Sequence, residues 1–356
     1  MNQELKQNFI IDRNDPVLVT GGAGFIGSAV VEDLLQRGFE NIICITRSTR
    51  GMARLAGLAE AYPRARVDIV EGNLLSNEDC RKCVRDVRVV LHLAAGRGEK
   101  FVPDAYLNSV VTTRNLLEAC AGEKNLRRFV NVSSFTVYTN AGKRKWRLLD
   151  ETCPVESRPE HRGDAYTYAK VKQDEMVEAY GQSHKIPYVI VRPGSVYSTV
   201  KGDLSNRVGI ATFGPFLHLG GSNQIPLSYV ENCADAIVLA GLVPGVDGEV
   251  INVVDDNLPS SRRLLALYKR NVRRFHSIYV PKLASYLLCY LWERYSHASQ
   301  GQLPPAFNRP CWRTFWRKTN YSNRKLKERL GWSQRVATDE GLKRFFEASR
   351  LGGANA

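Results

Sequence analysis

The 356-residue chain is poor in cysteine, has no excess of glycine or proline and contains no long apolar run. Eight Cys are too few for a disulfide scaffold, and we expect them to be reduced. The ordinary glycine and proline contents exclude a collagen-like or largely disordered chain. Cys80 and Cys83 form a lone C-x-x-C without a second Cys or His pair at zinc-finger spacing, so no metal site is predicted. Residues 1–15 have no apolar signal core, which predicts a cytoplasmic protein.

The net charge of +14 comes entirely from the C-terminal part of the chain. Residues 1–260 carry 30 Lys and Arg against 31 Asp and Glu, whereas residues 261–356 carry 20 against 5. This excess predicts an anionic partner there, such as a phosphate-bearing small molecule, lipid head groups or nucleic acid, of which nucleic acid is the least expected. A solvated basic surface without a ligand is the alternative.

Short β-branched runs alternate with helix-length segments between residues 17 and 254. The runs are apolar throughout, which is typical of strands buried on both faces. We expect strands at 17–20, 42–46, 67–70, 89–93, 129–133, 188–192 and 250–254, and helices at 28–37, 77–85, 108–121 and 166–181. This order predicts an α/β fold, a doubly wound parallel Rossmann sheet with helices on both faces.

The sequence divides into three predicted regions. Residues 1–15 form an N-terminal extension and residues 16–256 the dinucleotide-binding core with the catalytic residues, to which part of 193–235 adds substrate-pocket residues. Residues 257–356 form a smaller, basic and aromatic C-terminal region that binds substrate or is an appendage to the sheet. We do not expect a second independent core there.

Within the C-terminal region, residues 283–292 (LASYLLCYLW) are nearly all apolar. As a helix they extend about 15 Å, roughly half of what a bilayer core requires, so they cannot span a membrane. A peripheral contact in the membrane interface is one reading, which would make the cytoplasmic protein membrane-associated. A buried helix or an oligomer contact is the commoner outcome, and we expect a homodimer.

A glycine-rich loop follows the first predicted strand. Thr20–Gly27 reads TGGAGFIG, with Gly21, Gly24 and Gly27 at three-residue spacing before a predicted helix. Glycines at these positions permit a tight turn and a close approach of backbone N–H groups to a pyrophosphate. The strand before and the helix after are the context that such a loop needs, so the sequence predicts a dinucleotide site.

The second predicted strand indicates which dinucleotide is bound. It ends at Thr46, followed by Arg47 and Ser48, where an NAD site usually has an Asp or Glu for the ribose hydroxyls. The guanidinium of Arg47 suits the 2′-phosphate of NADP. The sequence therefore favours NADP over NAD.

Tyr166 and Lys170 lie four residues apart in a predicted helix and so share one face. A phenol is a useful base near neutral pH only if a positive neighbour favours its ionised form, and an adjacent ammonium does this. Ser133 and Ser134 lie at the end of the fifth predicted strand, at the sheet edge where ligands bind. These four side chains are the candidate catalytic group.

Taken together, these motifs resemble the extended short-chain dehydrogenase/reductase family, of the NAD-dependent epimerase/dehydratase type. The resemblance covers about Pro16 to Asn252 and has two further matches, Tyr229–Asn232 and Leu330–Trp332. It implies that Tyr166 is the general acid/base, that Lys170 holds the nicotinamide ribose, and that Ser134, or less favourably Ser133, binds the reacting oxygen. It also implies a supporting role for Asn108, with Thr113 and Asn115 in the same pattern. The implied cofactor contacts are Gly21, Gly24, Phe25, Ile26, Gly27, Arg47, Asn73, Leu74, Leu93, Ala94, Ala95, Tyr166, Lys170 and Pro193.

The chain departs from the family pattern at positions that bear on the substrate. Ser195 stands where nucleotide-sugar enzymes usually have Asn, Ser198 and Thr199 replace Gly-Pro, and Phe135 and Thr136 replace the Asp-Glu pair of the dehydratases. We expect an NAD(P)-dependent oxidoreductase or epimerase acting on a nucleotide-activated or lipid-linked sugar, and no dehydration. Its candidate phosphate-binding residues are Arg207, Arg262, Arg263, Lys269, Arg273 and Arg274. The alternatives are a hydroxysteroid-dehydrogenase-like enzyme for an apolar alcohol, and a non-catalytic cofactor- or RNA-binding protein.

Overall fold

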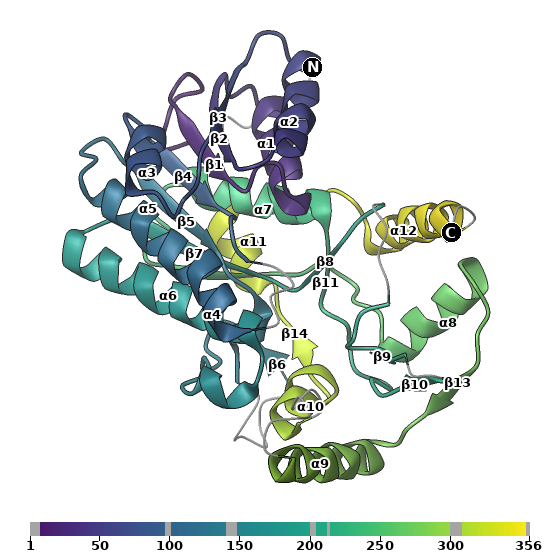
Figure 1. Ribbon diagram of the computed structural model, residues 1–356. Coiled ribbons are helices and arrows are strands. Elements are labelled where there is room, and N and C mark those ends of the chain that lie inside the picture. The colour runs from purple at the N-terminus through teal and green to yellow at the C-terminus, as the bar shows by residue number, and fades with distance from the viewer. Residues whose placement is uncertain are drawn as a thin grey trace.

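The computed structural model describes residues 8–96, 101–139, 148–199, 204–211, 214–299 and 308–353. Its centre is a seven-stranded parallel sheet in the order β12-β7-β5-β4-β1-β2-β3 (Figure 1). The strands are β1 (Val17–Thr20), β2 (Asn41–Thr46), β3 (Arg66–Glu71), β4 (Val89–His92), β5 (Arg128–Val132), β7 (Tyr188–Pro193) and β12 (Val250–Val253). All seven lie within one or two residues of the predicted strands, and the predicted doubly wound sheet is confirmed.

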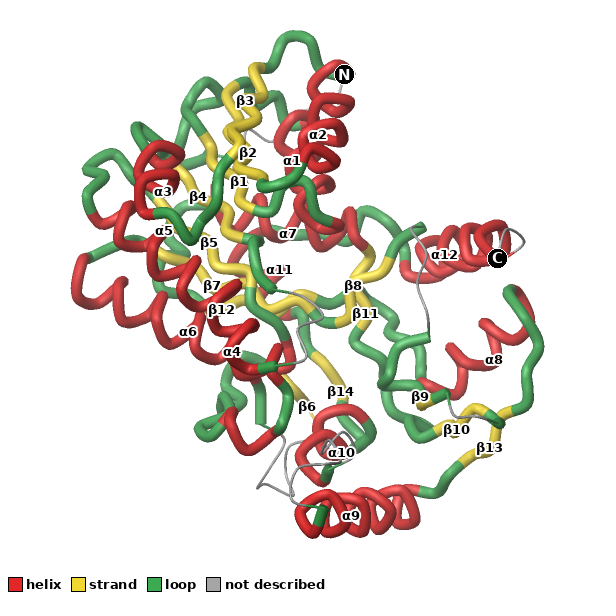
Figure 2. Tube along the Cα trace, viewed as in Figure 1, coloured by secondary structure: helices red, strands yellow, loops and turns green. Residues whose placement is uncertain are grey.

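Alternate residues of the inner strands enter opposite hydrophobic layers, which explains why these runs are largely apolar. Val17 and Val19 of β1 pack into one layer and Leu18 into the other. The first layer includes α1 (Phe25–Gln36), α2 (Thr49–Ala61) and α7 (Val230–Leu242), and the second α3 (Asn77–Val84), α5 (Thr112–Ala121) and α6 (Ala165–His184). Figure 2 shows the strands between these two sets of helices.

The sequence analysis did not predict two helices of the first layer, α2 and α7. Of the 13 residues of α7, 11 are buried, so the helix has no polar face to produce an amphipathic pattern. The helix predicted at 108–121 begins earlier, as α4 (Val102–Ala105), and passes through a π-helical segment, η1 (Tyr106–Val111), before α5. The other predicted helices are present, with α6 extending to His184.

The rest of the chain forms small sheets and helices, most of them beside the carboxyl edge of the large sheet. Residues 324–330 instead pack Leu326 and Leu330 into the first layer. Its helices are α8 (Ser261–Asn271), α9 (Lys282–Ala298), α10 (Arg309–Phe315), α11 (Arg324–Leu330) and α12 (Thr338–Gly353), with short 3₁₀ turns η2 (Phe135–Val137) and η3 (Pro159–Arg162). Its short strands are β6 (Leu148–Leu149), β8 (Ser195–Tyr197), β9 (Gly209–Ile210), β10 (Phe216–His218), β11 (Leu227–Tyr229), β13 (Ser277–Tyr279) and β14 (Asn320–Tyr321). None of the described helices is long and apolar enough to cross a bilayer. The three-region division of the chain stays a prediction.

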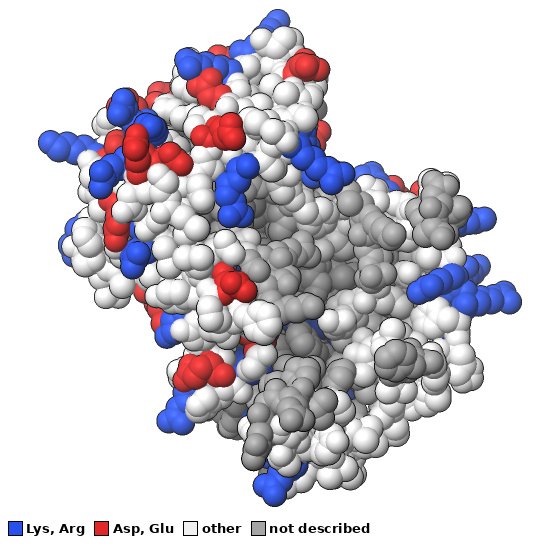
Figure 3. Space-filling view, viewed as in Figure 1, with Lys and Arg blue, Asp and Glu red and all other residues white. Residues whose placement is uncertain are grey.

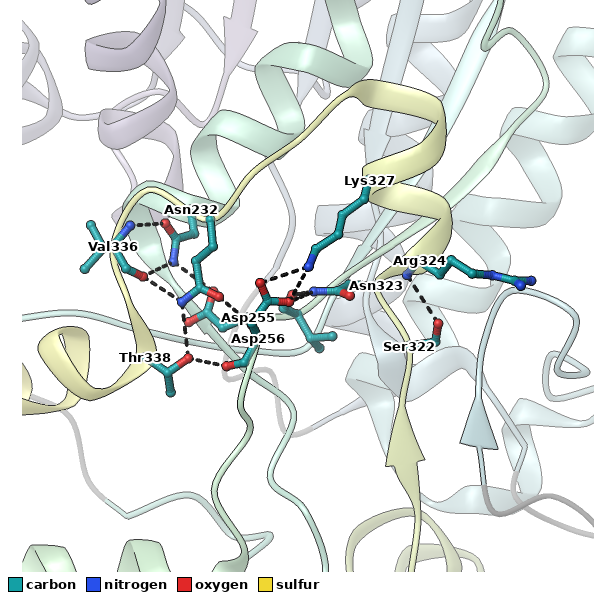
Figure 4. Close-up of polar contacts among 11 residues, drawn as sticks. Asn232, Asp255, Asp256, Ser322, Asn323, Arg324, Lys327, Val336 and Thr338 are labelled. Carbon is teal, nitrogen blue, oxygen red and sulfur yellow. Dashed lines mark hydrogen bonds and ion pairs between the residues drawn. The ribbon is translucent and has the colours of Figure 1, made fainter.

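A polar cluster attaches the C-terminal helices to the end of β12 (Figure 4). The carboxylate of Asp256 accepts hydrogen bonds from Asn323 Nδ2 at 2.7 Å and from Lys327 Nζ at 2.7 and 2.9 Å. Asn232, fully buried at the start of α7, exchanges two hydrogen bonds with the backbone of Val336 at 2.8 and 2.9 Å. Trp332 Nε1 donates to the Asn232 carbonyl at 3.2 Å, so the two tail motifs of the resemblance meet in this cluster.

Candidate active site

The glycine-rich loop connects β1 to α1 in a geometry that only glycine permits. Gly21 has φ +71°, and a Cβ there would lie 2.9 Å from the backbone nitrogen of Ala94. A Cβ on Gly27 would lie 2.0 Å from the carbonyl oxygen of Gly21. The first turn of α1 is thereby pressed against the end of β1, and its N–H groups lack intrahelical acceptors. The shape of this loop and the N–H donors of the first turn of α1 both suit the pyrophosphate of a dinucleotide.

A buried polar chain crosses the sheet behind this loop. Thr20 Oγ1 accepts from the Ala94 N–H at 3.2 Å and lies 2.7 Å from His92 Nδ1, while His92 Nε2 lies 2.9 Å from Thr113 Oγ1. Burial, reinforced by the nearby Lys170 charge, lowers the pKa of His92 to about 3, so the imidazole is neutral. The chain fixes the segment 93–95 at the end of β4, where the strand order turns and open α/β sheets bind ligands.

The other predicted cofactor residues lie at the same edge of the sheet. Arg47 is exposed directly after β2, and Ser48 caps α2 by accepting from the Gly51 N–H at 3.1 Å. After β3, the Asn73 side-chain oxygen accepts from the Leu75 N–H at 3.1 Å. Pro193 ends β7. Each of the cofactor residues named from sequence thus follows a strand's carboxyl end or opens α1, apart from Tyr166 and Lys170 on α6.

The start of α6 carries the Tyr166–Lys170 pair. Asp164 caps the helix, accepting from the Tyr166 N–H at 3.2 Å and from the Thr167 hydroxyl at 2.5 Å. Lys170 Nζ donates to the carbonyl of Val132 at 2.7 Å. Because Val132 is the last residue of β5, this bond fixes the first turns of α6 at the strand end from which Ser133 and Ser134 emerge.

The two serines have different surroundings. Ser133 is buried and its hydroxyl donates to Asp174 Oδ2 at 2.8 Å, so it belongs to the interior network below the site. Among the described residues, the Ser134 oxygen accepts one long hydrogen bond, from the Thr136 N–H at 3.3 Å. Its hydroxyl proton can therefore be donated to a ligand. This difference favours Ser134 over Ser133 for contact with a reacting oxygen.

A buried ion pair underlies the candidate catalytic group, and the sequence analysis did not identify it. Arg192 donates through Nε and Nη2 to Asp174 Oδ2 at 3.1 and 3.0 Å, and Asn131 Nδ2 donates to Asp174 Oδ1 at 2.9 Å. Asp174 lies one helical turn beyond Lys170. Burial lowers the pKa of Lys170 to about 8, against the opposing attraction of the Asp174 carboxylate. The ammonium therefore keeps its charge near neutral pH although it is buried.

Because the pKa of Lys170 is lowered in the folded protein, we expect the free energy of unfolding to depend on pH. Below pH 8 the lysine is charged in both the folded and the unfolded protein; between pH 8 and 10.5 only the unfolded chain holds the proton, so folding stability rises there. Relative to Lys170→Met, the free energy of unfolding of the parent should increase by roughly 1.4 kcal/mol per pH unit in this window. Urea titrations of both proteins at pH 8 and pH 9.5 measure the difference, and a difference independent of pH would contradict the assignment.

Asn108 lies in the π-helical segment η1, half-buried, with its carbonyl accepting from the Thr112 hydroxyl at 3.0 Å. Its neighbour Ser109 accepts from the Gly96 N–H at 2.9 Å and so joins η1 to the loop after β4. Single π-helical turns occur frequently at functional sites. Hydrophobic periodicity could not predict this π-helical segment, because over six residues its sequence pattern does not differ from that of an α-helix.

The six basic residues predicted to meet phosphates separate into two groups. Arg207 is buried; its Nη1 donates to the Thr314 carbonyl at 2.9 Å and to the Tyr321 hydroxyl at 3.3 Å. The Tyr321 ring stacks on Phe135, the residue after Ser134, with centroids 5.6 Å apart. The other five residues lie on α8 or directly after it: Arg262, Arg263, Lys269, Arg273 and Arg274.

A second arginine that the sequence analysis missed lies beside Arg207. Arg162, 2% exposed, donates to the Thr136 carbonyl at 2.6 Å and to Thr314 Oγ1 at 2.9 Å. Within the described ranges neither Arg162 nor Arg207 forms an ion pair with a carboxylate. Two buried cations that share Thr314 next to the Ser134 segment favour an anionic or strongly polar ligand.

Cys80 and Cys83 are both buried, and burial raises the pKa of each thiol to about 12, so both carry their protons. The Cys83 thiol donates to the Cys80 carbonyl. Among the residues that the structure describes, no group of three or more His, Cys, Asp or Glu side chains is arranged to hold a metal ion.

Comparison with known proteins gives four findings. The model of the NAD dependent epimerase/dehydratase family matches residues 17–254. An uncharacterized UDP-glucose epimerase, YtcB, of Bacillus subtilis is 29% identical over 257 residues, which are 67% of this chain and 76% of that protein. A 3-beta-hydroxysteroid dehydrogenase of Mycolicibacterium neoaurum is 28% identical over 262 residues, 67% of each chain. The crystal structure of a UDP-glucuronic acid 4-epimerase from Bacillus cereus, in complex with UDP-glucuronic acid and NAD, has the same fold, with a TM-score of 0.69 at 22% identity over 94% of this chain and 99% of that one.

Proposed function

Because the chain belongs to the NAD-dependent epimerase/dehydratase family, we propose that it is an enzyme that oxidises a ring hydroxyl of a nucleotide-activated or lipid-linked sugar. The observation that carries the proposal is the bond from Lys170 Nζ to the Val132 carbonyl. It supports a site in which Tyr166 and Lys170 approach the Ser134 end of β5 beside the glycine-rich loop. The bound nicotinamide supplies the hydride acceptor.

In the proposed reaction, residues of this chain transfer one proton. Tyr166 removes the proton of the substrate hydroxyl as its carbon is oxidised, and returns it when the carbonyl is reduced. The Lys170 ammonium stabilises the phenolate form of Tyr166 and holds the ribose, for which its charge near neutral pH is required. Ser134 donates its hydroxyl proton to the reacting oxygen, and Asn108 supports the group from η1. The glycines Gly21, Gly24 and Gly27 hold the pyrophosphate.

The choice of cofactor is part of the proposal. The family is NAD-dependent, and NAD is present in the Bacillus cereus structure named above. A preference for NADP rests on Arg47, which is exposed after β2 without a neighbouring carboxylate at Thr46 or Ser48. We therefore propose NADP as the preferred cofactor, and the product assay compares both dinucleotides.

A charged substrate is favoured over an apolar one by the two buried arginines. Arg207 and Arg162 flank Thr314 beside the Ser134 segment, where a steroid would leave them without an anion. The likeness to a 3-beta-hydroxysteroid dehydrogenase nevertheless makes an apolar alcohol the second candidate. Reduction of a dinucleotide by a hydroxysteroid, with none by nucleotide sugars, would select it.

The proposal is tested by product analysis with purified protein. The protein is incubated with NAD or NADP and, separately, with UDP-glucose, UDP-glucuronic acid or a 3β-hydroxysteroid, and the products are identified by NMR. We expect conversion of a nucleotide sugar to its C4 epimer or to the keto sugar, with no water loss because Phe135 and Thr136 lack acid–base groups. Arg207→Gln should raise KM for that sugar at least about tenfold, whereas Arg263→Gln on α8 should not. No turnover of any nucleotide sugar or lipid-linked sugar with either dinucleotide would refute the proposal.

The homodimer and the cytoplasmic location rest on the sequence analysis alone and remain predictions. The peripheral membrane contact through residues 283–292 also remains a prediction.

A further inference from the structure

Helix α9 presents an apolar face to solvent. Leu283, Leu287, Leu291 and Tyr295 follow one another at four-residue spacing, which aligns them along one side of a helix. They are 82%, 53%, 53% and 62% exposed. With Leu288 and Tyr290 beside them, 54% and 37% exposed, they form what we call the α9 apolar face. Soluble monomers rarely expose contiguous apolar patches beyond roughly a few hundred Å², and larger ones mark interaction sites.

The opposite side of the same helix already has its partner. Cys289 is buried with Trp316 and Leu219, and Trp312 Nε1 of α10 donates to Ser285 Oγ at 2.8 Å. Tyr286 packs edge-on against the Trp312 ring with centroids 5.1 Å apart. In Figure 1, α9 lies at the outer edge of the molecule with α10 on its inner side. The α9 apolar face is therefore not needed to hold the helix. Of the two commoner outcomes expected for 283–292, the fully buried helix is wrong, whereas the oligomer contact stays a prediction.

The part of the chain that includes α9 carries almost only positive charges. Between residues 257 and 323 the sequence has 12 Lys and Arg and a single acidic residue, Glu293. Arg309 neutralises that carboxylate with two hydrogen bonds, Nε to Oε2 at 2.9 Å and Nη2 to Oε1 at 3.0 Å. In Figure 3 the acidic side chains lie mostly over the large sheet and its helices, whereas Lys and Arg show near α8.

We propose that the α9 apolar face docks on an anionic membrane surface, with the helix lying in the plane of the interface. An apolar face flanked by basic residues is the signature of such helices, which combine burial of leucines with attraction to acidic lipids. A second copy of the chain is disfavoured as the partner of this face, because two segments with the same strong positive charge would repel each other. Tyr290 and Tyr295 suit the head-group level, and the exposed Arg294 can extend from it to lipid phosphates. A surface-bound enzyme would meet a lipid-linked sugar directly, but the docking itself does not depend on the proposed function.

The test is co-sedimentation of the full-length protein with vesicles of phosphatidylcholine alone or mixed with phosphatidylglycerol. We expect the mixed vesicles to bind at least about tenfold more protein, and about 1 M NaCl, where the Debye length is near 3 Å, to weaken the binding. The double variant Leu287→Asp/Leu291→Asp should lose at least about tenfold in partitioning. Leu351→Asp is the matched control, because Leu351 is 73% exposed on α12 and should leave binding unchanged.

The control measurements separate docking from misfolding and from self-association. The double variant should keep the circular dichroism spectrum and the dinucleotide affinity of the parent. Equal binding of the double variant and the parent to anionic vesicles would overturn the proposal, as would absence of binding by the parent. A parent dimer that the double variant converts to a monomer in solution, together with no vesicle binding, would instead assign the face to a second copy of the chain.

Discussion

Tyr166→Phe should lower kcat by roughly 100- to 10,000-fold, the usual contribution of a positioned acid or base. The substitution removes only the phenolic oxygen, and the ring stays at the start of α6, where Asp164 caps the helix. Dinucleotide affinity and thermal stability should therefore stay close to those of the parent. Steady-state kinetics with the substrate found in the product assay, together with fluorescence titration of the dinucleotide, measure the two effects.

Tyr168→Phe is the matched control for this substitution. Tyr168 lies two residues further along α6, on a different side of the helix, and is half-buried like Tyr166. Its variant should keep nearly full activity. If Tyr166→Phe and Tyr168→Phe had equal rates, the proton would be carried by another group and the proposed role of Tyr166 would be wrong.

Gly27→Ala should have the second largest effect, on dinucleotide binding. Its Cβ would lie 2.0 Å from the Gly21 carbonyl oxygen, which is backbone and cannot move aside without shifting β1 or α1. Such overpacking typically costs about 1–3 kcal/mol, and here it also displaces the N–H groups of the first turn of α1 from the pyrophosphate. We expect dinucleotide affinity to fall at least about tenfold and the urea midpoint to decrease.

Gly57→Ala serves as the opposite control. Gly57 lies within α2, and nothing lies within 4 Å of a Cβ added there. An exposed glycine inside a helix costs about 1 kcal/mol relative to alanine, so this variant should be slightly more stable and bind dinucleotide normally. If both glycine variants bound dinucleotide equally well, the close contact between Gly27 and Gly21 would not matter for the site.

The large sheet could be predicted because its inner strands are largely apolar on both faces. Val17, Leu18 and Val19 enter two different hydrophobic layers, which leaves no polar position in the strand. Helix α7 could not be recognised by amphipathic pattern for the related reason that it is buried on nearly all sides. Strands such as β9 and β14 have two residues each, and no periodic signal exists at that length.

The candidate site was predictable where its residues are neighbours in sequence. Tyr166 and Lys170 share a helix face, and the glycine spacing defines the loop, so local patterns were sufficient. Asp174 and Arg192, in contrast, are 18 residues apart on a helix and a strand, and nothing in either segment indicates the buried pair. The burial of Arg207 and the exposure of Leu283 likewise depend on how distant segments pack.

The most direct test of the central claim is the absorbance of reduced nicotinamide after rapid mixing. Protein loaded with NAD or NADP is mixed with the nucleotide sugar that the product assay selects, beside the Tyr166→Phe and Tyr168→Phe variants. The account predicts that the reduced-nicotinamide band rises in the parent and in Tyr168→Phe, and rises at least about 100-fold more slowly in Tyr166→Phe. A parent that binds dinucleotide and sugar but never reduces the dinucleotide, or a Tyr166→Phe variant that reduces it at the parental rate, would contradict the account.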